Sequence, residues 1–102
     1  MITYEKTFSG DANVYVRATR LPHELQVFVT SVEASAKLGS LVYGVHSKYG
    51  ITCTLLVRAE ADELAERLCK GLVKRSGKNV LLGCGVQHAD MVDILQWLTS
   101  VL

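Results

Sequence analysis

The hydrophobic pattern divides the chain into an alternating first part and a largely helical second part. In the first part, short runs in which apolar and polar residues alternate are separated by turn residues, as is typical of half-buried β-strands. This pattern predicts five strands, at residues 2–8, 13–20, 25–32, 40–46 and 51–57. From Ala61 the apolar positions follow helical spacing, which predicts a helix that ends near Gly77. A strand at 80–86 and a helix at 90–102, with Asp90 as its N-cap residue, should complete the chain.

This order of elements predicts an α+β fold. Five strands, a helix, a strand and a helix would form an antiparallel sheet of about six strands, with both helices on one face. Short turns between the first five strands favour antiparallel pairing, because a parallel pair needs a longer crossover connection. No repeat or linker interrupts the sequence, so we expect a single domain that spans residues 1–102.

The two faces of the predicted sheet differ in composition. One face is almost wholly aliphatic and should be covered by the helices; it comprises Val14, Val16, Leu25, Val27, Val29, Ile51, Cys53, Leu55 and Val57. The other face mixes polar and large side chains, namely Tyr15, Arg17, Thr19, Gln26, Phe28, Thr30, Thr52, Thr54 and Leu56. This mixed face either meets solvent or packs against a second subunit, since interfaces often combine polar and aromatic residues. For the second interpretation the candidate dimer-interface residues are Tyr15, Phe28, Thr30, Thr52 and Thr54.

Charge and composition argue against several classes of protein. The net charge is +1 with both signs interspersed, so we expect no nucleic-acid partner. No apolar run approaches the roughly 18 residues that span a bilayer, and the first residues show no apolar signal core, so we expect no membrane partner. Cys53, Cys69 and Cys84 lie in apolar contexts without CxxC spacing. This favours buried, reduced thiols in a cytosolic protein over a disulfide.

The segment Gly83-Cys84-Gly85 follows a predicted strand and invites comparison with nucleotide-binding turns. The dinucleotide fingerprint requires a third glycine, where this chain has His88, and another parallel strand after the helix. Cys84 and His88 share no helical face, and the histidines lie in separate turns or strand ends. We therefore expect no enzyme, no metal site and no cofactor. A small regulatory ligand- or nucleotide-binding domain that uses the Gly83–Gly85 turn remains the alternative function.

Lys70, Lys74, Arg75 and Lys78 form a basic cluster near the end of the first predicted helix. Cations at a helix C-terminus interact favourably with the helix dipole. The cluster is therefore either a solvated helix end or a surface that docks on an acidic patch of a partner. For docking, the candidate contact residues are Lys70, Lys74 and Arg75.

Three segments resemble proteasome assembly chaperone three: KLGSLVYG at 37–44, ITCTLLV at 51–57 and GKNVLLGCGV at 77–86. The stretch ELAERLCKGLVKRSGKNVLL is similar to the sister chaperone four, which shares the fold. The resemblance implies a non-enzymatic α+β protein that forms a dimer, with its sister chaperone or with itself. It also implies binding to an α-type subunit of the 20S proteasome and promotion of α-ring assembly. We expect a cytoplasmic location, and a nuclear one as well.

Overall fold

The structure, a computed structural model, describes residues 2–9, 13–31, 39–59, 61–86 and 91–101 of the chain. Its elements appear in the predicted order. They are β1 (Ile2–Phe8), β2 (Val14–Arg20), β3 (Glu24–Ser31), β4 (Ser40–Ser47), β5 (Gly50–Val57), α1 (Asp62–Ser76), β6 (Asn79–Cys84) and α2 (Met91–Val101). The predicted cap Asp90 lies outside the described residues.

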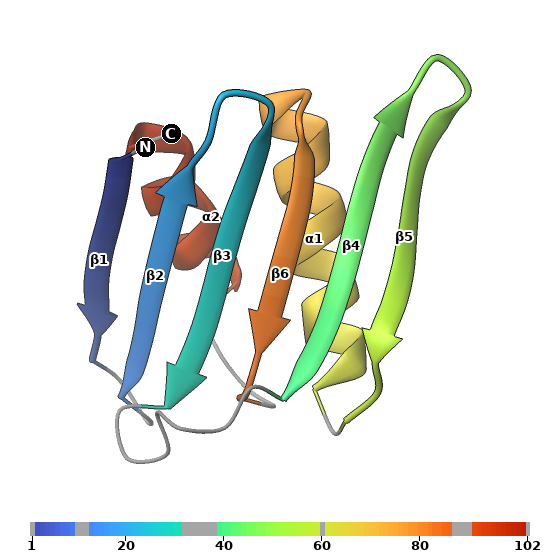
Figure 1. The fold of residues 1–102 in the computed structure, drawn as a ribbon. Helices are drawn as coiled ribbons and strands as arrows, with labels where there is room; N and C mark the ends of the chain where they lie inside the picture. Colours follow the sequence, from blue (N-terminus) through green and yellow to red (C-terminus); the bar gives the residue numbers. More distant parts are fainter. Residues whose placement is uncertain (1, 10–12, 32–38, 60, 87–90, 102) are drawn as a thin grey trace.

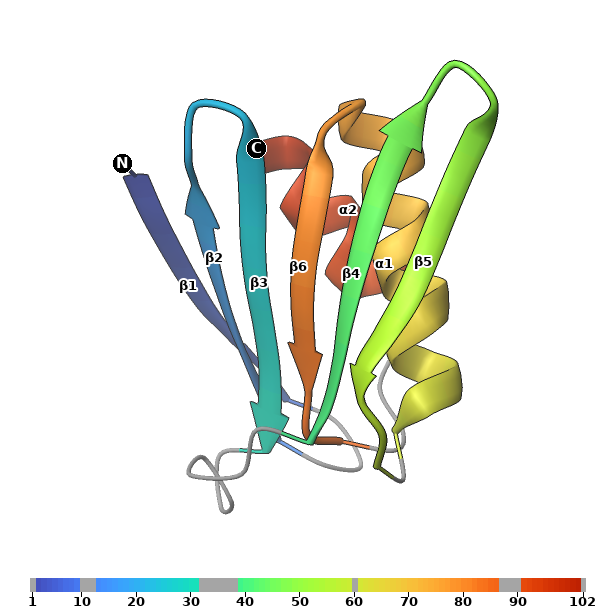
Figure 2. The same ribbon diagram turned by 45° about the vertical axis from the view of Figure 1, so that its right-hand side comes forward.

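The molecule has two layers, a six-stranded sheet and a pair of helices that cover one of its faces (Figures 1 and 2). The aliphatic residues of β2 and β3 face the helices and are at most 4% exposed: Val14, Val16, Ala18, Leu25, Val27 and Val29. Leu68 of α1 and Leu98 of α2 are fully buried in the same core. The predicted α+β class, with both helices on one face, is confirmed.

The helices do not cover the edge strand β5 completely. Val57, which the alternation assigns to the covered face, is 43% exposed. The register between β4 and β5 shifts between Leu41 and Val42, so Leu41 is paired with Val57 and Val42 with Leu55. This irregularity interrupts the strict alternation of faces at the end of β5. The burial predicted for Val57 is therefore wrong.

The strand order, β1-β2-β3-β6-β4-β5, departs from a succession of hairpins. β6 lies between β3 and β4, parallel to β3 and antiparallel to β4. Because β5 is also antiparallel to β4, β5 and β6 run in the same direction, and α1 is the crossover that joins them. The expectation of an entirely antiparallel sheet is therefore wrong for the β3–β6 pair. It is correct for the hairpins β1–β2, β2–β3 and β4–β5.

Helix α1 ends at the predicted glycine. Gly77 adopts a left-handed conformation, with φ of 69°, and its amide donates to the carbonyl of Val73 at 2.9 Å. A residue with a Cβ is disfavoured in this conformation, which explains why the helix ends at a glycine. The chain then turns directly into β6, so the C-terminal end of α1 lies beside the start of the central strand β6 (Figure 1).

The carboxylate of Asp62 fastens the start of α1 to β4. It accepts hydrogen bonds from the Ser40 hydroxyl at 2.7 Å and from the Ala59 amide at 2.9 Å. The Ala59 amide first, and then the Ser40 hydroxyl, lower the pKa of Asp62 below its ordinary value of 3.8. A carboxyl group whose pKa is lowered by folding stabilises the folded state above its unfolded pKa. That contribution is lost as the pH falls towards the folded pKa.

Replacing Asp62 by asparagine should therefore lower the free energy of unfolding at neutral pH. The difference between wild type and Asp62→Asn should shrink as the pH falls below 3.8, because the wild-type carboxylate then becomes protonated. Urea unfolding at a series of pH values from neutral to acidic measures this difference. A difference that stays constant over the series would contradict the assigned role of the Asp62 charge.

Candidate protein–protein interface

No described helix or strand covers the sheet face opposite the helices (Figures 1 and 2). We call it the open face. Its central apolar side chains are those of Phe28 on β3, Leu81 on β6, and Leu41, Tyr43 and Val45 on β4. Four of the five are half-buried, and Val45 is 36% exposed. Leu56, near the end of β5, is 55% exposed.

The strand register brings these side chains together. Tyr43 is the cross-strand neighbour of Leu81, while Leu41 and Phe28 lie on either side of Gly83. Neighbouring strands are about 4.8 Å apart, so side chains in adjacent positions are in contact range. Gly83 is buried although it has no side chain, which means that neighbouring groups cover it. The result is one continuous apolar patch across β3, β6 and β4.

Charge on the described part of the open face is confined to β1, β2 and the start of β3. Glu5 on β1 and Arg17 on β2 are cross-strand neighbours, with 3.8 Å between Oε1 and Nε. Beside them, desolvation and then a hydrogen bond with Glu5 raise the pKa of Tyr15. Glu24 starts β3. The open-face residues of the other three strands are uncharged: Asn79, Leu81, Gly83, Leu41, Tyr43, Val45, Thr52, Thr54 and Leu56.

The predicted dimer-interface residues all belong to the open face. They are Tyr15, Phe28 and Thr30, which are half-buried, and Thr52 and Thr54, which are exposed. Apart from Phe28, they flank the apolar patch. The centre of the patch, at Leu41, Tyr43 and Leu81, was not predicted from the sequence, because only the insertion of β6 beside β4 brings these residues together. Apolar residues at every second position of β4 and β6 could have indicated that these strands contribute to the patch.

The predicted docking residues Lys70, Lys74 and Arg75 lie on α1, in the helix layer, and are exposed. Within the described ranges none of the three forms an ion pair, whereas Arg67, on the same helix, contacts Glu63 at 2.7 Å. The positive charge of these three side chains is therefore available to a partner. Helix α1, which carries them, lies on the other side of the sheet from the open face (Figure 1).

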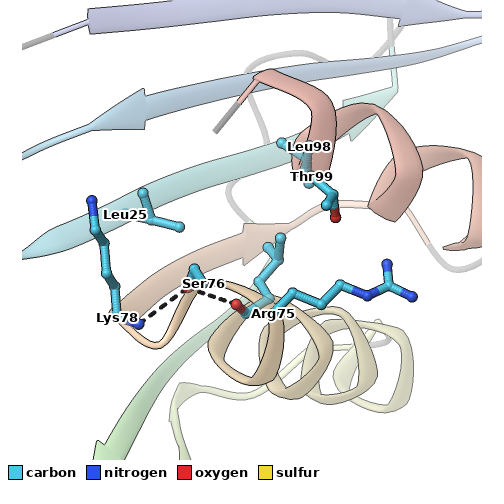
Figure 3. Close-up of a pocket in the computed structure, with 7 residues that line it drawn as sticks. Leu25, Arg75, Ser76, Lys78, Leu98 and Thr99 are labelled. Atoms are coloured by element: carbon cyan, nitrogen blue, oxygen red, sulfur yellow. Dashed lines mark hydrogen bonds between the residues drawn. The ribbon is translucent and has the colours of Figure 1, made fainter.

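A pocket of about 270 Å³ lies beside this basic cluster, between the ends of α1 and α2 (Figure 3). Leu25 and Leu98 line its interior but are themselves almost inaccessible to water. Arg75 and Lys78 also line it, and both remain at least partly exposed. These two side chains place positive charge at the pocket, which therefore continues the positive surface of the basic cluster.

The Gly83–Gly85 turn lacks a free amide for a phosphate at its last position. The amide of Gly85 donates to the carbonyl of Val29 at 2.7 Å, and Gly83 is part of β6. Between them, the buried Cys84 thiol donates to a backbone carbonyl at 3.3 Å, and burial raises its pKa. His88 lies outside the described residues.

The described residues contain no group of three or more His, Cys, Asp or Glu side chains that could hold a metal ion. None of the helices in the described ranges has the length and apolar character needed to cross a membrane.

Comparison with known proteins assigns the family. The family model described as proteasome assembly chaperone 4 matches residues 13–86, well over half of the chain. The chain belongs to the proteasome assembly chaperone 4 family. The match confirms the sister family noted from the sequence, and it does not confirm the closer resemblance to chaperone three. The matched residues run from β2 to β6 and include α1.

A solved structure shares the fold of this proteasome assembly chaperone 4 family member. It is a chain of a "Novel Chaperone Complex for Yeast 20S Proteasome Assembly". The TM-score is 0.73 at 12% identity, and the alignment covers 98% of this chain and 93% of the other. At this identity the likeness concerns the fold alone. No curated protein matches the sequence.

Proposed function

We propose that this proteasome assembly chaperone 4 family member is a non-enzymatic chaperone of 20S proteasome assembly that acts as a dimer. The open face carries this proposal. Its apolar patch on β3, β6 and β4 is left uncovered by the described elements, and exposed apolar patches commonly mark protein interfaces. The other subunit would be a sister chaperone or a second copy of this chain, and its own sheet would cover the patch.

The charges on the open face favour a particular placement of the second sheet. Stacked sheets pack about 10 Å apart with interdigitating side chains, and burying an unpaired charge between them is costly. An interface centred on β6 and β4 buries uncharged residues. It leaves Glu5 and Arg17 at the rim, where both remain more than half exposed as they are in the single chain. Thr52 and Thr54 would line the opposite rim on β5.

We also propose that Lys70, Lys74 and Arg75 dock the dimer on an acidic patch of a proteasome α-type subunit. The three side chains are exposed, without ion pairs among the described residues, and remote from the open face. Both surfaces can therefore be occupied at once. Holding one α-type subunit in a single pose would admit its correct neighbour and exclude others, which promotes α-ring assembly through specificity. The cytoplasm is the expected location, with the nucleus as a second one.

Co-expression with individual α-type subunits tests this function. The purified protein should sediment as a species heavier than 11.2 kDa at micromolar concentration, and it should retain at least one α-type subunit. Changing Lys70, Lys74 and Arg75 together to glutamate should weaken retention without changing sedimentation. Lys48→Glu, at the tip of the β4–β5 hairpin, is a charge-reversal control outside the cluster and should retain the subunit normally. An 11.2 kDa species throughout would contradict a dimer of two copies of this chain, and an 11.2 kDa species that persists when a sister chaperone is also co-expressed would contradict the dimer altogether. Retention unaffected by the triple change would contradict the proposed docking surface.

A further inference from the structure

Two thiols meet on the covered side of the sheet, beneath α1. Val80 on β6, Gly44 on β4 and Cys53 on β5 are successive cross-strand neighbours. The Cys69 thiol of α1 donates to the Val80 carbonyl at 3.7 Å, and the Cys53 side chain lies close enough to help raise the pKa of Cys69. Cys69 therefore lies above Gly44, between Val80 on one neighbouring strand and Cys53 on the other.

Gly44 allows this close approach. A Cβ at position 44 would lie 2.6 Å from the Cys69 Sγ, 2.7 Å from a methyl group of Val73 and 3.6 Å from the Cys53 Sγ. The first two distances are far shorter than the roughly 3.5–4.0 Å of favourable non-bonded contacts. The missing side chain at position 44 leaves the space in which the two sulfur atoms come together.

We propose that Cys53 and Cys69 form a redox modification site, at which a low-molecular-weight disulfide such as glutathione disulfide closes an intrachain disulfide between β5 and α1. All three cysteines of the chain were expected to be buried, and Cys69 and Cys84 are. Cys53, however, is only half-buried, on an edge strand. A soluble oxidant can therefore reach Cys53, while Cys69 is shielded behind it.

The reaction consists of two thiol–disulfide exchanges. The Cys53 thiolate attacks one sulfur of glutathione disulfide, which forms a mixed disulfide and releases one glutathione. Cys69 then loses its proton and attacks the Cys53 sulfur, which forms the Cys53–Cys69 bond and releases the second glutathione. The two protein thiols are oxidised, and one glutathione disulfide is reduced to two glutathione molecules.

The environment of Cys69 predicts which exchange is slow. Burial, and then the neighbouring Cys53, raise the pKa of the Cys69 thiol. The effect of burial remains once Cys53 is in the mixed disulfide, and the thiolate is the nucleophile, so the second exchange should limit the rate and should accelerate as the pH rises. The product would tie edge strand β5 to α1. If the proposed function holds, it would also secure Thr52 and Thr54 at the rim of the dimer interface.

Cys84 is too remote to compete with this pair. It lies on β6, four residues beyond Val80, which corresponds to about 13 Å along a strand. It therefore serves as an internal reference thiol.

Incubation of the reduced protein with glutathione disulfide, at neutral pH and about one unit above it, tests the site. After denaturation and alkylation, peptide mass spectrometry should show the loss of two of three free thiols, a linked Cys53–Cys69 peptide pair and an alkylated Cys84. The linked pair should form faster at the higher pH. Glutathione that persists on Cys53 while Cys69 stays reduced, or a disulfide between chains, would overturn the proposal.

Three variants sharpen the result. Cys84→Ala should give the same linked pair, whereas Cys69→Ala should stop with one glutathione on Cys53. Gly44→Ala should slow the linkage, because the added methyl group displaces the Cys69 sulfur. The wild-type peptide map decides the proposal even where a variant fails to fold. It requires neither the dimer nor a proteasome subunit, so failure of the proposed function leaves this test intact.

Discussion

A lysine in place of Leu81 should convert the proposed dimer into a monomer. Leu81 lies at the centre of the open face, half-buried within its own chain, so a lysine there can still extend its ammonium group into water when the chain is alone. In a sheet-to-sheet dimer that charge would be buried without a partner, at a cost of about 3 kcal/mol or more. Dissociation should become at least about a hundredfold more favourable. Sedimentation equilibrium over a range of concentrations measures the change.

Val92→Lys is the matched control for Leu81→Lys. Val92 is also aliphatic, but it lies on α2 in the other layer and is 59% exposed. Its replacement should leave the association unchanged, and circular dichroism should show that both variants remain folded. Normal association of a folded Leu81→Lys protein would place the interface elsewhere, most simply on the helix layer.

Truncation of Leu68 to alanine should reduce the free energy of unfolding by about 2–5 kcal/mol. The side chain is fully buried between α1 and the sheet, so its removal loses the transfer free energy of the deleted atoms and leaves a cavity. Urea unfolding should be measured in the Leu81→Lys background. There, dissociation of a dimer would not contribute to the measured stability.

Two further variants provide comparisons for the expected loss of stability at Leu68. Glu66→Ala, an exposed position on the same helix, should change the free energy of unfolding by less than about 0.5 kcal/mol. The loss of unfolding free energy for Leu55→Ala should lie between the losses for Glu66→Ala and Leu68→Ala, because Leu55 is only half-buried on the edge strand β5. A loss at Leu68 no larger than at Leu55 would mean that the core around Leu68 closes over the missing atoms.

The extent of each strand and helix was readable from local patterns. Alternation set the strands to within about two residues at each end, and the helical spacing with the Gly77 stop set α1. Local chemistry decides these features, since the side-chain period of 2 or 3.6 residues and the conformational freedom of glycine act on neighbouring residues. For the same reason, the residues that face the helices on β2 and β3 were predicted correctly.

The order of the strands in the sheet could not be predicted from local hydrophobic patterns. The assumption that successive strands pair with each other failed at β3 and β4, because β6 arrives from much later in the chain and lies between them. An apolar pattern on both faces shows that a strand is buried on both sides, but it does not name the neighbouring strands. The centre of the open face was missed for the same reason, because Tyr43 and Leu81 are cross-strand neighbours that belong to segments far apart in the sequence.

The sequence by itself thus determined the elements, the fold class, the composition of each sheet face and the resemblance to the proteasome assembly chaperones. Only the tertiary structure decided that β6 joins β3 to β4, where the apolar patch of the open face is centred, and that Gly44 lets the thiols of Cys53 and Cys69 meet. The physical reason is the range of the interactions. Periodicity and caps depend on residues a few positions apart, whereas strand neighbours and helix–sheet contacts depend on the packing of the whole chain.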